Sequence, residues 1–75
     1  FNVYPNPAAD MINVEFSENF NGSVSILDIA GKEVSTSTVS GVQHTVSTSA
    51  LTNGIYFVKV NDGTASQIER IVVKK

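Results

Sequence analysis

The stretch that decides the fold is Leu51-Thr52-Asn53-Gly54-Ile55-Tyr56-Phe57-Val58-Lys59-Val60. Its second half alternates, because Tyr56, Val58 and Val60 point to one face of an extended chain while the residues between them point to the other. β-Branched and aromatic residues in this pattern are typical of a strand, and Asn53-Gly54 predicts the turn before it. Tyr56 also stands where a tyrosine corner would place it, with its hydroxyl bonded back to the backbone at a connection between sheets.

The same alternation recurs on both sides of this stretch. Ile12, Val14 and Phe16 share one face of a predicted strand, with polar residues between them. Turn-forming residues separate the apolar runs: Asn61-Asp62-Gly63-Thr64 predicts a hairpin and Ala30-Gly31 a tight turn. The strands expected from the pattern are a short first one that ends at Pro5, then 12–16, 24–29, 34–39, 42–46, 55–60 and 65–73.

This spacing predicts the fold class. About seven short strands with turns every 8–12 residues are typical of a β-sandwich, and no segment long enough for a helix has helical periodicity. We therefore expect an all-β, immunoglobulin-like β-sandwich of about seven short antiparallel strands with Greek-key connections. Segment 17–22 is expected to be a loop and Ser40-Gly41 a turn, and Leu27 and Ile29 suggest a strand that is buried on both faces.

Composition restricts the kind of protein. The 75 residues are 41% hydrophobic and 16% charged, against a usual charged fraction of about 25%, as expected for sheets with one wet face. A net charge of −2 gives no reason to expect a nucleic-acid or anionic-membrane partner. No apolar run approaches the ~20 residues of a membrane helix. Because the chain begins at Phe1 rather than Met, we expect residues 1–75 to be one domain from a longer protein.

The residue types that catalysis needs are scarce. The chain has one His and no Cys, and it contains neither a Gly-x-Ser-x-Gly elbow nor a nucleophile–base pair. His44 shares a strand face with Val42 and Val46, where we expect a half-buried spacer rather than a base or a metal ligand. We therefore expect no enzyme activity and no cofactor.

Metal and glycan sites are also weakly indicated. The carboxylates are spread along the chain, and no Asp/Asn/Gly-rich loop brings oxygen ligands together for calcium. Asn21-Gly22-Ser23 matches a glycosylation sequence but is interpreted as a turn that enters a strand. Phe1 and Tyr4 could belong to a sugar platform, but there is no Trp, and Phe16 and Tyr56 are expected in the core.

Each end of the chain allows two interpretations. Proline lacks an N–H, so Pro5-Asn6-Pro7 ends a first strand and is either a rigid linker junction or a docking epitope. At the other end, Ile71-Val72-Val73 is apolar on both faces and is followed by Lys74-Lys75. This is either a buried last strand whose lysines guard a sheet edge, or a terminal address that a receptor captures by adding to the sheet.

Three phrases in order carry a resemblance to a known family. They are Tyr4-Pro5-Asn6-Pro7, the 51–60 stretch and the terminal Ile71-Val72-Val73-Lys74-Lys75, with the turn Asp28-Ile29-Ala30-Gly31-Lys32-Glu33-Val34 between the first two. Over nearly its whole length the chain resembles the type A C-terminal sorting domain of the type IX secretion system of Bacteroidetes. It departs at Leu27, where an aromatic residue is frequent, and in the polar segment 35–38. The residues that match the recognition motif are Pro5, Asn6, Pro7, Asp28, Gly31, Lys32, Leu51, Gly54, Tyr56, Val58, Val72, Val73, Lys74 and Lys75.

This resemblance implies a non-catalytic C-terminal secretion signal that directs an N-terminal passenger across the outer membrane. It implies recognition by the type IX translocon and an outer-membrane shuttle protein, and removal of the tag upstream by a sortase-like signal peptidase. The passenger would pass through the periplasm and then be released or anchored at the cell surface. The alternative is an accessory immunoglobulin-like module that binds glycan or protein at the end of an extracellular enzyme, because a sandwich fold alone does not specify function.

Overall fold

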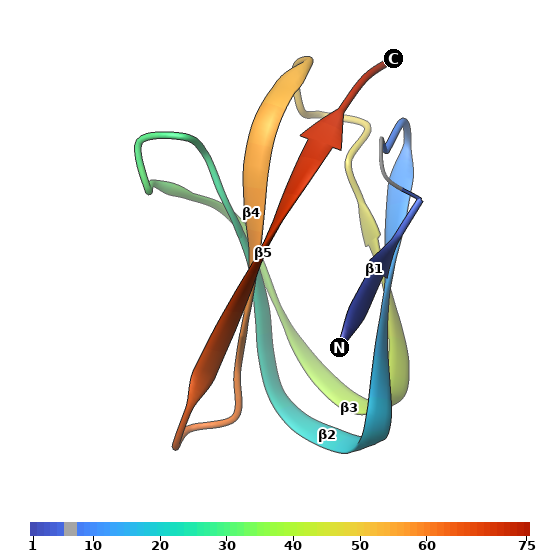
Figure 1. Cartoon of the computed structure of the whole chain (residues 1–75), viewed down its shortest axis with the longest axis vertical. Coiled ribbons are helices and arrows are strands. Elements are labelled where there is room, and N and C mark those ends of the chain that lie inside the picture. Colours follow the sequence, from blue (N-terminus) through green and yellow to red (C-terminus); the bar gives the residue numbers. More distant parts are fainter. Residues whose placement is uncertain (6–7) are drawn as a thin grey trace.

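Five strands are present in the residues that the structure describes, 1–5 and 8–75. The computed structural model joins them in one hydrogen-bonded sheet that curls on itself (Figure 1). Asn6 and Pro7, two of the motif residues, lie outside the described part. The first strand ends directly before Pro5, as expected. The strands are β1 (Asn2–Tyr4), β2 (Met11–Leu27), β3 (Glu33–Ser47), β4 (Gly54–Asn61) and β5 (Ser66–Val73).

The all-β class is confirmed, but the immunoglobulin-like sandwich of about seven strands is not: the described residues form five strands in one curled sheet. The expected strand 12–16 and most of the expected strand 24–29 are parts of β2, which ends at Leu27, and 34–39 and 42–46 are both parts of β3. The loop expected at 17–22 and the turn expected at Ser40-Gly41 were therefore wrong.

A β-bulge explains why two predicted breaks are absent. Glu15 lies opposite Gln43 and Phe20 opposite Gly41, so β2 contains extra residues here while β3 advances by only two positions. A bulge bends a strand and increases its twist without ending the pairing. The polar, Gly-containing segments interrupt the apolar alternation, and the sequence pattern therefore looks like a loop.

The long strands β2 and β3 carry the sheet through both halves of the molecule. The first part of β2 pairs with β1, where Asn2 lies opposite Glu15. Its last part pairs with β4, from Ser23 opposite Asn61 to Leu27 opposite Phe57. Between these parts both strands curve around the lower end, so that β1 lies on one side of the interior and β4 and β5 on the other (Figure 1).

The interior of this curled sheet holds the hydrophobic core. Its members come from every strand, as the alternation predicts, and Phe16 and Tyr56 are both buried. Ile29 is the exception: it is 74% exposed, because the chain has already entered the turn after β2, and the expected burial there was wrong. The fully buried large apolar side chains are Ile12, Ile26, Ile71, Val14, Val24, Val58 and Val73.

Gly22 lies where β2 passes closest to the end of β4. A Cβ atom at this position would lie 2.1 Å from the carbonyl oxygen of Asn61, well inside the distance at which atoms repel. The two strands can therefore pair here only because residue 22 has no side chain.

The segment after β1 closes one end of the sheet. Ala8 forms a parallel bridge with Val73: its amide donates to the carbonyl of Val72, and its carbonyl accepts from the amide of Lys74, each at 2.7 Å. The segment at Ala8 and the end of the chain are thereby joined at the C-terminal end of β5.

Candidate recognition surface

The segments that contain the sequence motifs meet at one end of the molecule. The turn between β2 and β3, the connection between β3 and β4, the C-terminus and the segment that leads from residue 8 into β2 all lie at the upper end in Figure 1. The bends of β2 and β3 and the turn between β4 and β5 lie at the lower end. Residues that are far apart in the sequence thus share one surface, and hydrogen bonds join three of the four segments.

The turn at 28–32 is held by one aspartate. The carboxylate oxygen Oδ1 of Asp28 accepts hydrogen bonds from the amides of Ala30 and Lys32, at 3.0 and 2.9 Å, and the backbone of Asp28 also bonds to Gly31 and Lys32. Gly31 has φ of 87°, a conformation that glycine adopts without steric cost. Asp28 and Gly31 therefore shape the turn, and Lys32 extends from it as an exposed residue.

The connection before β4 contains the tyrosine corner that the sequence predicts. The hydroxyl of Tyr56 donates to the carbonyl oxygen of Thr52 at 2.9 Å, and the ring is buried. Leu51 packs against the core, and its amide donates to the carbonyl of Thr48 at 3.0 Å. The connection is therefore held at one end by the packing of Leu51 and at the other by the hydroxyl of Tyr56.

The two C-terminal lysines have different roles. The amide of Lys75 donates to Oδ1 of Asn53 at 2.9 Å, and its ammonium donates to the carbonyl of Ser49. Lys75 thus ties the C-terminus to the connection before β4. Lys74 is held through its amide by Ala8, and its side chain is exposed.

Burial divides the described motif residues into three groups. Tyr56, Val58 and Val73 are buried in the core, so a partner cannot touch them while the domain is folded, and they stabilise the fold. Asp28, Leu51 and Val72 are half-buried. The exposed motif residues in the described part of the chain are Pro5, Gly31, Lys32, Gly54, Lys74 and Lys75.

Comparison with known families shows which family the chain belongs to. A family described as the secretion system C-terminal sorting domain matches residues 2–74, and this is the sorting domain of type IX secretion. The chain belongs to this family. None of the curated proteins compared with the chain matches it.

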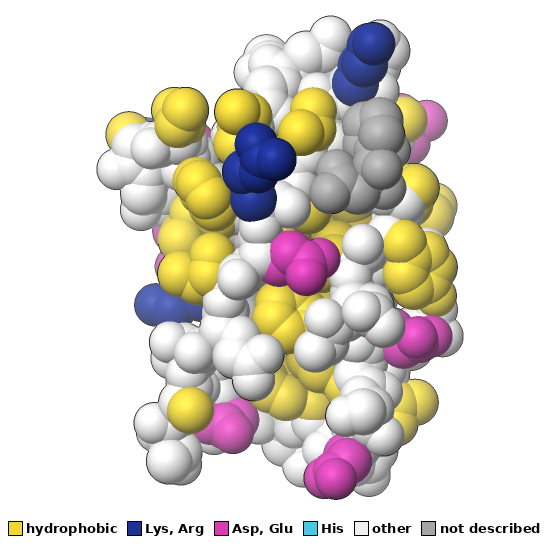
Figure 2. Space-filling view, in the orientation of Figure 1, with side chains coloured by type: hydrophobic (Ala, Val, Ile, Leu, Met, Phe, Trp, Pro, Cys, Tyr) yellow, Lys and Arg dark blue, Asp and Glu magenta, His cyan; other side chains and the backbone are white. Residues whose placement is uncertain are grey.

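A shallow apolar hollow on the sorting domain joins two of the motif segments. It has a volume of about 440 Å³ and lies between the turn residues Asp28 and Ile29 and residues 52–56, which lead into β4 and begin it. Ile55, 37% exposed, and Ile29 contribute apolar surface. Figure 2 shows hydrophobic side chains gathered over the upper parts of β4 and β5, close to basic side chains.

Sequence reasoning missed several residues that hold this surface of the sorting domain together. Thr48 is fully buried and donates to the carbonyl of Ala9 at 2.9 Å, while Asn53 and Ser49 accept from Lys75. For Asn53 the sequence pattern predicted a turn, and it did not predict a contact with the C-terminus. Each of these contacts joins a backbone group to a residue far away in the sequence, and a pattern along the sequence does not show such a contact.

The other candidate sites have structural explanations. His44 is half-buried, as expected, and its Nε2 shares a hydrogen bond of 2.9 Å with the hydroxyl of Ser37. Asn21 of the glycosylation sequence lies in β2, where its Oδ1 accepts from Ser40. In the described residues, no group of three or more His, Cys, Asp or Glu side chains could hold a metal ion. The same residues include no helix long and apolar enough to cross a membrane.

Proposed function

We propose that this sorting domain is a folded address, and that its upper end is the surface that the type IX machinery reads. The observation that carries the proposal is the gathering of the ordered motif segments at one end of the sheet, within a chain of the sorting-domain family. A linear signal would not need hydrogen bonds between distant segments. Here the hydrogen bonds of Ala8, Asn53 and Lys75 bind the segments into one surface.

Exposed basic residues are the proposed contacts. Lys32 and Lys74 both lie exposed at this end, and an ammonium group on a flexible stem suits an acidic receptor surface without a fixed geometry. Lys75 contributes differently, because its ammonium is bonded within the domain. The last strand and its lysines therefore form a docking edge for the outer-membrane shuttle protein and the translocon.

The remaining steps follow from the family role. The passenger lies N-terminal to the domain and passes through the periplasm. A sortase-like signal peptidase cuts the chain upstream of the domain, and the passenger is released or anchored at the cell surface. The domain itself supplies recognition and no chemistry.

An export assay tests the proposal. Residues 1–75 are fused behind a fluorescent protein that carries a periplasmic signal, in a Bacteroidetes host with and without a working type IX translocon. We expect fluorescence at the surface or in the medium of the first strain and only in the periplasm of the second. Periplasmic fluorescence in both strains would overturn the export role and favour an accessory binding module.

A further inference from the structure

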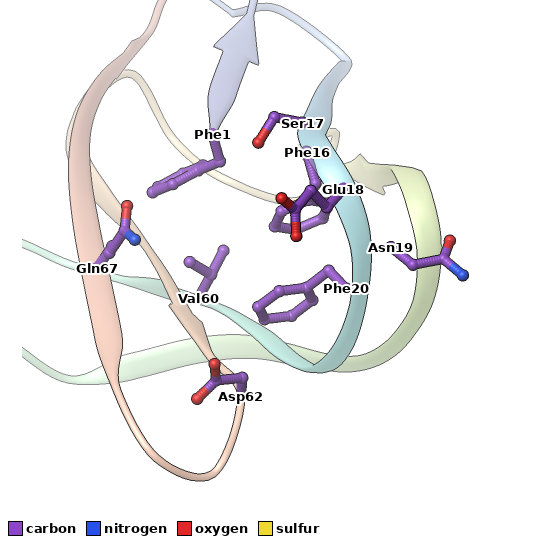
Figure 3. Close-up of a pocket in the computed structure, with 9 residues that line it drawn as sticks. All are labelled: Phe1, Phe16, Ser17, Glu18, Asn19, Phe20, Val60, Asp62 and Gln67. Atoms are coloured by element: carbon purple, nitrogen blue, oxygen red, sulfur yellow. The ribbon is translucent and has the colours of Figure 1, made fainter.

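A second hollow lies at the lower end of the sheet, away from the motif residues. It has a volume of about 250 Å³ and lies between the bend of β2 and the β4–β5 hairpin (Figure 3). Its lining includes the aromatic residues Phe1, Phe16 and Phe20 and the carboxylates of Glu18 and Asp62. The export role does not use this hollow.

The three phenylalanine rings form one aromatic cluster. Phe16 and Phe20 are stacked, with ring centroids 4.3 Å apart and planes within 2°, and Phe1 lies 6.3 Å from Phe16. Phe16 is buried, but Phe1 and Phe20 are only half-buried, so both rings border the hollow. In Figure 3 they lie on opposite sides of it, with Val60 between them. Aromatic faces carry negative potential and attract cations.

The charged side chains in the lining are negative, so they attract cations as the aromatic faces do. Glu18 and Asp62 contribute carboxylates, and none of the residues that line the hollow is Lys, Arg or His. Asp62 is held in place, because its Oδ1 accepts from the amides of Thr64 and Ala65 at 2.8 Å. These backbone hydrogen bonds also lower the pKa of Asp62, so the group is charged at neutral pH. Figure 2 shows acidic side chains, and no basic ones, across the lower end of this face.

An open strand edge runs beside the hollow. β5 pairs along its length with β4, and Ala8 covers its other edge only at Val73. In the described part of the chain, no strand pairs with the second edge of residues 66–69. Gln67 belongs to this edge and also lines the hollow, so a strand added here would pass the aromatic cluster. An unpaired edge is a template for an extended peptide.

We propose that this hollow receives the lysine or arginine side chain of an extended peptide that pairs with the open edge of β5 at residues 66–69. The rings of Phe1 and Phe20 contact the alkyl stem and the cationic group, and Glu18 and Asp62 neutralise its charge. The edge of β5 binds the peptide backbone. This site uses residues 66–69 at the start of β5, whereas the proposed export contacts are the lysines after its other end, so each proposal can fail without the other.

Peptide titration tests the proposal. The domain is prepared with an uncharged Gly-Ser extension before Phe1, so that Phe1 carries no ammonium group. NMR follows the binding of a capped peptide of alternating threonine and valine with one central lysine. We expect shifts at Phe20, Glu18 and Gln67, and binding about three- to tenfold weaker when norleucine replaces the lysine. Equal binding of the lysine and norleucine peptides would overturn the cation site.

Two further comparisons complete the test. Glu18→Gln and Phe20→Leu should each weaken binding about two- to fivefold, whereas Glu33→Gln, an exposed change in β3 at the other end, should not. The variants' amide spectra show whether each is still folded. N-methylation of the peptide backbone on the side that faces β5 should abolish binding. If n-butylammonium alone binds as tightly as the peptide, the proposed pairing with the strand edge is wrong.

Discussion

The carbonyl oxygen of Ala8 accepts a hydrogen bond from the amide of Lys74 at 2.7 Å. This contact joins the segment after the first strand to the end of the last one. It makes the C-terminus part of a closed end of the sheet, together with the contact of Lys75 with Asn53. Changes near the C-terminus are therefore expected to act on stability and on recognition, and experiments must separate the two.

The first prediction concerns the part of β5 that lies in the core. Ile71 has no exposed surface, so Ile71→Ala should destabilise the domain by about 2–5 kcal/mol through lost burial and the cavity left behind. Small domains have little stability to spare. Urea unfolding followed by circular dichroism measures the effect. Ile68→Ala, at a side chain 57% exposed on the same strand, is the control and should change stability by less than about 0.5 kcal/mol.

The second prediction concerns the tyrosine corner. Tyr56→Phe removes the hydroxyl that donates to the carbonyl of Thr52 and keeps the buried ring. We expect a loss of about 0.5–1.5 kcal/mol in the free energy of unfolding. Tyr4→Phe, on a side chain 41% exposed, should have almost no effect. Equal losses for the two variants in thermal melts would contradict the structural role of the corner.

Two glycines should respond differently to substitution. At Gly31 the only obstacle is the positive φ, since nothing lies within 4 Å of an added Cβ. Asn tolerates that conformation better than Ala, so Gly31→Asn should be milder than Gly31→Ala. At Gly22 the carbonyl of Asn61 occupies the space of any Cβ, and Gly22→Ala should prevent folding or separate β2 from β4. Amide exchange rates at the β2–β4 pairing distinguish the two cases.

Stability at low pH should depend on Asp62. Hydrogen bonds from the amides of Ala65 and Thr64 lower the pKa of Asp62 in the folded domain below its ordinary value of 3.8. The charged form is therefore favoured by folding, so this contribution is complete above pH 3.8 and is lost as the pH falls through the lower folded pKa. Asp62→Asn keeps an acceptor in the turn and should reduce the fall in melting temperature between pH 5 and pH 2. An unchanged fall would mean that other carboxylates cause it.

Much of the fold follows from local chemistry in the sequence. The hairpin at 61–64 and the corner at Tyr56 depend on residues a few positions apart, and both were predicted. The continuity of β2 through 17–22 was not, because a bulge in a polar segment has the same composition as a loop. The bridge between Ala8 and Val73 uses backbone groups of distant segments, which leave no side-chain signal.

The candidate site could be predicted only in part. Resemblance to the family selects its motif residues but does not tell a core residue such as Val58 from a surface residue such as Lys74. Burial separates them, and burial needs the folded structure. The hollow beside Phe20 carried no motif, since its lining comes from β2, β4 and β5, from the turn at Asp62 and from Phe1 before β1.

The last prediction separates recognition from stability at the C-terminus. Deleting residues 71–75 should abolish export, but it also removes Ile71 and Val73 from the core, so the deletion alone is ambiguous. Lys74→Glu changes only an exposed side chain whose contact is made through its amide, and it should leave the free energy of unfolding within about 0.5 kcal/mol. We expect this single charge reversal to reduce export of the fluorescent fusion strongly. Lys59→Glu, on β4 and away from the upper end, is the charge-reversal control; because Lys59 is half-buried, its free energy of unfolding is measured too, and the folded variant should be exported normally. Normal export of the Lys74→Glu fusion would exclude the terminal lysine side chain as a contact of the translocon.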